Sequence, residues 1–234
     1  MKFIVDQTIF TALPTACFGV VVARNINNHQ DYPAIAALLA ANLAKTEQCY
    51  SGQKVKELTA IRPYRESFHK LNLNPNKFMS SIEAMFTRVS KGKGLPSINP
   101  IVDLGNALSL KYTLPMGAHD LEQMDQDIQL RLSTPEDTFI PFGATEQQQM
   151  PADEPVYAVG QQIRTRRWIW QQSELGKITA DSKDIFFPLD GFTDCNLPAI
   201  TAAQQELAAF CRDQFNCTEI KIGLIDQQHP QMEL

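Results

Sequence analysis

The stretch PIVDLGNALSLKYTLPMGAHDLEQMDQDIQLR, from Pro100 to Arg131, contains the change of pattern that decides the fold class. Apolar residues recur at helical spacing from about Asn99 to Leu110, and the turn LPMGAHD then ends the helix. Beyond Asp120 apolar and polar residues alternate, beginning at Ile128–Leu132, as they do in strands. The stretch therefore predicts helices before the turn and mainly strands after it.

The residues that precede this stretch combine buried strands with helices. Lys2–Val5 and the β-branched run Cys17–Ala23 (CFGVVVA) are typical of strands. Pro33–Glu47 has Ala and Leu at helical spacing behind a proline that can begin a helix. Asn76–Val89 has one apolar helical face, and Ser80 or Ser81 can cap its first turn.

Short alternating segments separated by Pro, Gly and Asp make up most of the remaining chain. The strands predicted after Leu132 are Thr138–Phe142, Pro155–Val159, Ile163–Trp170, Ile185–Pro188 and Glu219–Ile225. An amphipathic helix is predicted at Leu197–Phe215. We expect an α+β fold with mixed, mostly antiparallel sheets and packed helices, forming one compact unit over residues 1–234.

Composition and charge argue against several classes of protein. The net charge of −5 disfavours nonspecific coating of nucleic acid, although a local basic groove is still possible. The five cysteines are scattered without a C-x-x-C pair, which favours free thiols in a reducing cytoplasm. We expect no signal peptide and no membrane span, because no apolar run has the required length.

Metal and nucleotide motifs are also missing from the sequence. The four histidines are isolated from one another, whereas zinc needs three or four clustered ligands. The segment KGKGLPS does not have the spacing of a phosphate-binding loop, and there is no G-x-S-x-G nucleophile motif. We therefore expect no metal, no cofactor and no use of ATP.

Basic side chains gather in three places although the chain as a whole is negative. One group is Arg62 and Arg65, and a second, Arg88, Lys91 and Lys93, ends a predicted helix. The third group is Arg164, Arg166 and Arg167 in the segment IRTRRWIW, where Trp168 and Trp170 accompany it. They are either ordinary solvated side chains or contacts for phosphates and stacked bases, and both interpretations stay open.

The turn LPMGAHD has the residue types of a ligand-binding turn. Gly117 lets the backbone approach a ligand closely, and His119 could transfer a proton near neutral pH. His119 could equally be a turn residue that bonds a neighbouring carbonyl. Asp120 could cap a short helical turn.

The order of several motifs carries more information than any one of them. SSIEAMFTRV, KGKGLPSIN, IVDLGNALS, LPMGAHDLEQ, IQLR and RRWIWQQSELGKIT follow one another along the chain. This order resembles the tRNA-editing (B-three/B-four) domain of the bacterial phenylalanyl-tRNA synthetase β chain in a freestanding form. The resemblance covers about residues 61–190.

The resemblance implies an α+β fold and hydrolysis of the ester that joins a wrong amino acid to tRNA. Asn106 falls on the asparagine of the V-D-x-x-N segment, and Glu174 falls near a glutamate that binds the substrate's amino group. The family carries a histidine where this chain has Gly117, and His119 lies two positions further on. WQQSE also replaces a glycine pair, which fits a pocket for a different amino acid.

We therefore expect a cytoplasmic deacylase that acts in trans on mischarged aminoacyl-tRNA and has no ligase activity. The expected catalytic residues are His119, Asn106 and Glu174, converging on one cleft, and the expected substrate-binding residues are Gly117, Ala118 and Trp170. The expected tRNA-binding residues are Arg88, Lys91, Lys93, Arg166, Arg167 and Trp168. Two alternatives are a non-catalytic tRNA- or RNA-binding module and an amino-acid-binding protein on the same fold.

Overall fold

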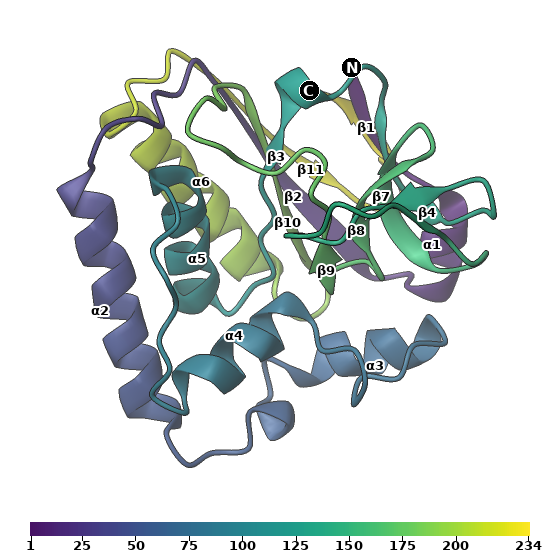
Figure 1. Ribbon diagram of the computed structural model, residues 1–234. Helices are drawn as coiled ribbons and strands as arrows, with labels where there is room; N and C mark the ends of the chain where they lie inside the picture. Colours follow the sequence, from purple (N-terminus) through teal and green to yellow (C-terminus); the bar gives the residue numbers. More distant parts are fainter.

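The computed structural model describes residues 1–234 and contains two β-sheets packed with helices (Figure 1). The four-stranded sheet has the order β11-β2-β10-β3, and all of its neighbouring strands are antiparallel. Its strands are β2 (Ala16–Arg24), β3 (His119–Asp120), β10 (Ile185–Phe192) and β11 (Glu219–Ile225). The predicted α+β class is confirmed.

The second sheet has eight strands in the order β12-β1-β4-β7-β8-β5-β6, and β9 pairs with β8. Only β1 with β4 and β5 with β8 run parallel, so the sheet is mixed and mostly antiparallel as predicted. The strands are β1 (Lys2–Val5), β4 (Ile128–Leu132), β5 (Thr138–Phe139), β6 (Gln148–Gln149), β7 (Pro155–Val159), β8 (Gln162–Arg166), β9 (Gln171–Gln172) and β12 (Gln231–Glu233).

Most of the helices lie on one side and at one end of these sheets, and a short N-terminal helix lies beside β4 (Figure 1). The α-helices are α1 (Gln7–Ala12), α2 (Pro33–Tyr50), α3 (Arg62–Lys70), α4 (Ser81–Val89), α5 (Pro100–Tyr112) and α6 (Leu197–Asp213). Short 3-10 turns occur at Val55–Glu57 and Leu121–Gln123. Ser80 caps α4, and Asp120 caps the second 3-10 turn by accepting a hydrogen bond from the Glu122 amide, so both predicted caps are confirmed.

Strand β2 is buried on both faces because the four-stranded sheet lies between two apolar layers. Val21 faces one core, which α5 and α6 share with this sheet, and Val20 and Val22 face the other core, toward the eight-stranded sheet. Alternate residues of a strand point to opposite faces, so a continuous apolar run serves both cores. Helix α6 packs closely on β2, since a Cβ added at Gly19 would lie 2.5 Å from a methyl carbon of Ile200.

One predicted strand ends earlier than its sequence pattern indicates. The segment Ile163–Trp170 was expected to be extended, but β8 stops at Arg166. Arg167 and Trp168 both take left-handed backbone conformations, with φ of 51° and 59°. Two such residues in succession reverse the chain, because strand geometry requires negative φ. Thr138–Phe142 is likewise shorter than predicted and is extended only at Thr138–Phe139.

None of the helices combines the length and the apolar character that crossing a membrane requires.

Candidate functional site

A cavity of about 630 Å³ opens between helix α5, the turn that follows it, strand β9 and the loop after β9. Apolar side chains supply half of its wall. The lining residues that matter below are Asn106, Gly117, Ala118, Trp170, Gln172 and Lys177. Three residues predicted to bind substrate, Gly117, Ala118 and Trp170, therefore lie around one cavity together with Asn106.

A smaller cavity of about 90 Å³ adjoins the first, and several of the residues that line it are buried. Five residues line both cavities, namely Met116, Gly117, Trp170, Gln171 and Gln172. The smaller cavity is also lined by His119, Tyr157, Trp168 and Asp190. The site is thus a wide outer chamber joined to a narrow inner one.

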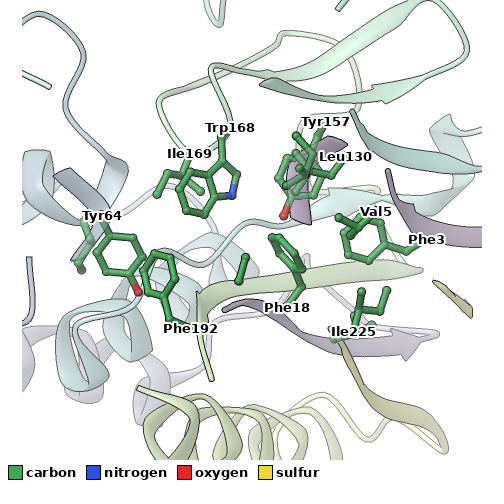
Figure 2. Close-up of a cluster of buried hydrophobic side chains, with 14 of the residues drawn as sticks. Phe3, Val5, Phe18, Tyr64, Leu130, Tyr157, Trp168, Ile169, Phe192 and Ile225 are labelled. Atoms are coloured by element: carbon green, nitrogen blue, oxygen red, sulfur yellow. The ribbon is translucent and has the colours of Figure 1, made fainter. Parts of the chain in front are cut away.

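Asp190 is a buried carboxylate on the wall of the inner cavity. The Tyr157 hydroxyl and the Trp168 indole N–H each donate a hydrogen bond of 2.6 Å to its Oδ1 atom, whereas Oδ2 has no partner in the protein. Burial raises the pKa of Asp190 from 3.8 to about 6, and the hydrogen bonds from Tyr157 and Trp168 oppose that rise. Figure 2 shows both aromatic side chains in the same buried cluster.

The left-handed backbone at Trp168 explains how this contact arises. The reversal after β8 turns the indole inward, where only 1% of Trp168 remains exposed and its N–H reaches Asp190. Left-handed conformations at residues other than glycine are unfavourable by roughly 1–3 kcal/mol each, so packing must hold this turn in place. The rings of Tyr64, Phe68 and Phe192 surround the indole and provide that packing.

His119 is also buried, with 2% of its surface exposed, and lies between two aromatic rings. Its ring stacks on Phe186 at a centroid distance of 5.9 Å and lies 6.0 Å from the ring of Tyr157. Burial, with a smaller contribution from the positive charge of Arg164, lowers the pKa of His119 from 6.5 to about 3. The imidazole is therefore neutral at pH 7, and its Nδ1 atom has no hydrogen-bond partner in the protein.

The turn at Gly117 and Ala118 brings backbone groups to the place where the two cavities meet. A Cβ at Gly117 would lie 3.1 Å from Pro188 Cγ and 3.4 Å from His119 Nε2, so a side chain there would be crowded. The Gly117 amide donates to the Pro188 carbonyl at 2.9 Å and is not available to a ligand. The Ala118 amide has no acceptor in the protein, while the Ala118 carbonyl accepts a hydrogen bond from Gln172.

The three residues predicted to be catalytic do not all line the same cavity. Asn106 lines the outer cavity, and His119 lines the inner one. Glu174 lines a separate polar cleft, which shares Lys177 and Thr179 with the outer cavity. The hydrogen bond from Lys177, and next that from the Gly143 amide, lower the pKa of Glu174, so its carboxylate is already partnered. The predicted single cleft is thus formed without Glu174.

The structure divides the residues predicted to bind tRNA into two groups. Arg88, Lys91 and Lys93 are exposed at the end of α4 and in the loop that follows, as a surface contact requires. The other group differs, because Arg166 and Arg167 both pair with Glu154, at 2.8 and 2.6 Å.

Trp168 cannot stack on a base from its buried position, so its prediction as a tRNA contact is wrong. The prediction rested on the basic residues that accompany Trp168 in IRTRRWIW, and the left-handed turn places its indole in the interior. Arg167 instead lies with its guanidinium carbon 3.9 Å from the centre of the Phe78 ring and 4.8 Å from that of Trp170. This stacking helps to fix Trp170 at the wall of the outer cavity.

Asp190 and Tyr157 are the polar site residues that sequence reasoning missed. Asp190 interrupts the apolar segment IFFPLDGF, and a carboxylate inside such a segment is a usable signal for a buried functional group. Tyr157 gave no comparable signal, because a tyrosine fits an ordinary strand core. No group of three or more His, Cys, Asp or Glu side chains is arranged to hold a metal ion.

Residues 64–208 match the B3/4 domain family, and this is more than half of the chain. The chain therefore belongs to the B3/4 domain family. All residues that form the inner cavity lie within the matched segment.

Among solved structures, an N-terminal fragment of the phenylalanyl-tRNA synthetase β-subunit from Pyrococcus horikoshii is similar, with 10% sequence identity and a TM-score of 0.49. The alignment covers 93% of this chain and 49% of that fragment, so the chain spans about half of the fragment's length. A search of curated proteins gives no significant match.

Proposed function

We propose that this protein hydrolyses the ester bond of mischarged aminoacyl-tRNA, acting in trans as a deacylase. The observation that carries the proposal is the pair of joined cavities, an outer chamber with a half-apolar wall and an inner one lined by the buried Asp190 and His119, inside the segment that matches the B3/4 domain family. Ligand pockets in proteins are commonly 300–1,000 Å³, about the size of the outer chamber. The order of the sequence motifs resembles the tRNA-editing domain of the phenylalanyl-tRNA synthetase β chain, and that resemblance suggests tRNA as the partner.

The inner cavity would select the amino-acid side chain. The Asp190 carboxylate has one oxygen without a protein partner, which would accept a hydrogen bond from a hydroxyl or amino group of the substrate. A purely apolar side chain would leave that oxygen unpaired in a dry site. Leaving a buried polar group unpaired can reduce reactivity about 10⁴-fold, which is enough to spare a correctly charged tRNA.

Hydrolysis of an activated ester requires orientation of water and stabilisation of the oxyanion more than a strong nucleophile. The free Ala118 amide at the outer cavity is a candidate oxyanion donor, and Asn106 is a second polar residue that lines this cavity. His119 is neutral at pH 7, so it would orient a water or a ribose hydroxyl rather than supply a positive charge. One oxyanion donor contributes roughly 3 kcal/mol.

The RNA would be held by the exposed basic residues at the end of α4. Arg88, Lys91 and Lys93 remain available, whereas Arg166 and Arg167 must first release Glu154. Because few positive charges are free on a chain of net charge −5, binding would be local and weakened by salt.

The test is release of amino acid from a panel of mischarged tRNAs by the purified full chain. Asn106→Ala should slow the reaction about 10–100-fold, since it removes a polar group from the cavity wall. Asn27→Ala is a matched control, because Asn27 is exposed and does not line the cavities. Glu174→Ala tests the role that the family resemblance gave to Glu174. Absence of release from every mischarged tRNA would refute the proposal.

A second candidate function is amino-acid binding without hydrolysis. It is favoured by the position of Glu174 outside the joined cavities and by the pairing of Arg166 and Arg167 with Glu154. Calorimetry with free amino acids would distinguish the two functions. Amino-acid binding without tRNA affinity or ester release would select the binding protein. An RNA-binding module built on Trp168 is disfavoured, because that indole is buried.

A further inference from the structure

Arg164 on β8 is a buried cation without a carboxylate partner. Only 3% of the residue is exposed, yet none of the ion pairs within 4.0 Å in the structure involves it. Every other well-shielded arginine has such a partner. Arg65 pairs with Glu83 at 2.6 Å, and Arg131 pairs with Asp137 at 2.7 Å. The exception at Arg164 therefore requires an explanation other than a structural ion pair.

The guanidinium of Arg164 also leaves most of its donors unused. It carries five N–H groups, and only Nη2 donates, to the Gln123 carbonyl at 2.9 Å. The Nε atom is buried without any partner. Desolvation lowers the pKa of Arg164, and the distant charge of Asp125 only partly opposes this. A cation in this condition destabilises the free protein unless a ligand supplies oxygen acceptors.

A polar cleft of about 420 Å³ lies beside this guanidinium. Its walls include Asp120, Gln123, Gln162, Arg164, Glu174 and Lys177. The acids on these walls are already occupied. Asp120 accepts hydrogen bonds from the Ser182 hydroxyl and the Glu122 amide, and Glu174 accepts from Lys177 and the Gly143 amide. Neither carboxylate forms an ion pair with Arg164.

Gly176 completes the wall next to Arg164. Its φ is +71°, and a Cβ there would lie 3.3 Å from Arg164 Nη1 and Cδ. A larger residue would therefore press on the guanidinium and strain the backbone. The free Nη1 side of Arg164 is thus kept uncovered by a glycine.

We propose that this cleft is an anion subsite in which Arg164 binds a phosphate group, with Lys177 as a second cation. The planar fork of a guanidinium matches the oxygen spacing of a phosphate and can donate two parallel hydrogen bonds. Lys177 and Thr179 line both this cleft and the outer cavity, so the phosphate would lie next to the amino-acid site. The phosphate can come from an RNA backbone or from a free mononucleotide or inorganic phosphate. Only the choice of RNA rests on the proposed function.

The experiment is titration calorimetry of the full chain with inorganic phosphate, AMP and a short RNA hairpin ending in CCA. Wild type is compared with Arg164→Met and with Arg212→Met, a control arginine that is exposed on α6. We expect Arg164→Met to weaken phosphate binding about tenfold or more, because charge-assisted hydrogen bonds are lost. Arg212→Met should bind as wild type does. Ester hydrolysis is not measured, so a failure of the deacylase proposal leaves this result unchanged.

Thermal melting separates a ligand-binding arginine from a structural one. Arg164→Met should melt at the wild-type temperature or above it, since the substitution removes a poorly compensated buried charge. If Arg164→Met does not fold, Arg164→Lys takes its place in the same titrations, with weakened but measurable phosphate binding expected.

Each outcome of the titrations has a definite meaning. Arg164-dependent binding of phosphate and AMP supports the subsite with a free ligand, and Arg164-dependent binding of the RNA alone supports it with a phosphodiester. Equal binding by wild type and the Arg164 variant, or no binding of any of the three, would overturn the proposal.

Discussion

Two buried groups at the inner cavity should give the protein opposing responses to pH. Burial raises the pKa of Asp190 from 3.8 to about 6 and lowers the pKa of His119 from 6.5 to about 3. Between pH 4 and 6 the folded protein therefore keeps a proton on Asp190 that the unfolded chain has lost. In the same pH range His119 is neutral in the folded protein but protonated in the unfolded chain.

The signs of the two contributions follow from these pKa values. Asp190 contributes stability that is fully present below pH 3.8 and is lost as the pH rises to about 6. For His119, whose folded pKa is depressed, the stability is present above pH 6.5 and is lost as the pH falls toward 3. Each contribution changes by about 1.4 kcal/mol per pH unit within its range. In wild type the two slopes nearly cancel between pH 4 and 6.

Single substitutions should expose each slope separately. Asp190→Asn should gain roughly 2–3 kcal/mol of stability relative to wild type when the pH is raised from 4 to 7. His119→Gln should gain a similar roughly 2–3 kcal/mol relative to wild type when the pH is lowered from 7 to 4. The measurement is urea unfolding at half-unit pH intervals, with the wild-type curve subtracted so that all other titrating groups cancel.

The refuting result is equally specific. If the difference between Asp190→Asn and wild type stays constant from pH 4 to 7, Asp190 does not titrate in a desolvated site. A constant difference for His119→Gln would show that its imidazole reaches solvent. Either result would remove the physical basis for an inner cavity that selects polar side chains.

Three further perturbations test other parts of the structure. Tyr157→Phe removes one hydrogen bond that lowers the pKa of Asp190, so this pKa should rise. In the same urea series, the pH range over which Asp190 changes the free energy of unfolding should then extend to higher pH. Gly117→Ala should lower stability by about 1–3 kcal/mol in urea unfolding through its close approach to Pro188, and should reduce ester hydrolysis. Arg131→Met should cost about 3–5 kcal/mol in urea unfolding, because it leaves the fully buried Asp137 unpaired.

Local patterns were sufficient to predict the elements that form the scaffold of the site. The run Cys17–Ala23 became β2, the capped segment after Ser80 became α4, and the apolar helix before the turn became α5. These predictions succeed because hydrophobic period and helix caps act over a few residues. Asn106, Gly117, Ala118 and Trp170, which were selected from motifs whose order resembles a known family, line one cavity, whereas Glu174 lies outside it.

The conformation of the segment around Trp168 could not be predicted from its local sequence. We predicted a strand over Ile163–Trp170 with Trp168 as a tRNA contact, but two left-handed residues turn the indole onto Asp190, which lies on β10 in the other sheet. The local preference against left-handed geometry is only a few kcal/mol, and burial of a large aromatic ring offsets it. That compensation depends on contacts distant in sequence, which no short window contains.

The sequence by itself determined the α+β class, the existence and order of the main helices and strands, and the turn that follows α5. Only the tertiary structure decided that Asp190 and His119 lie buried at the inner cavity, that Glu174 lies outside it, and that Arg164 has no partner. The physical reason is that the two kinds of property depend on interactions over different distances along the chain. Secondary structure follows from neighbours along the chain, whereas burial, pKa and unpaired donors depend on which distant surfaces exclude water from a side chain.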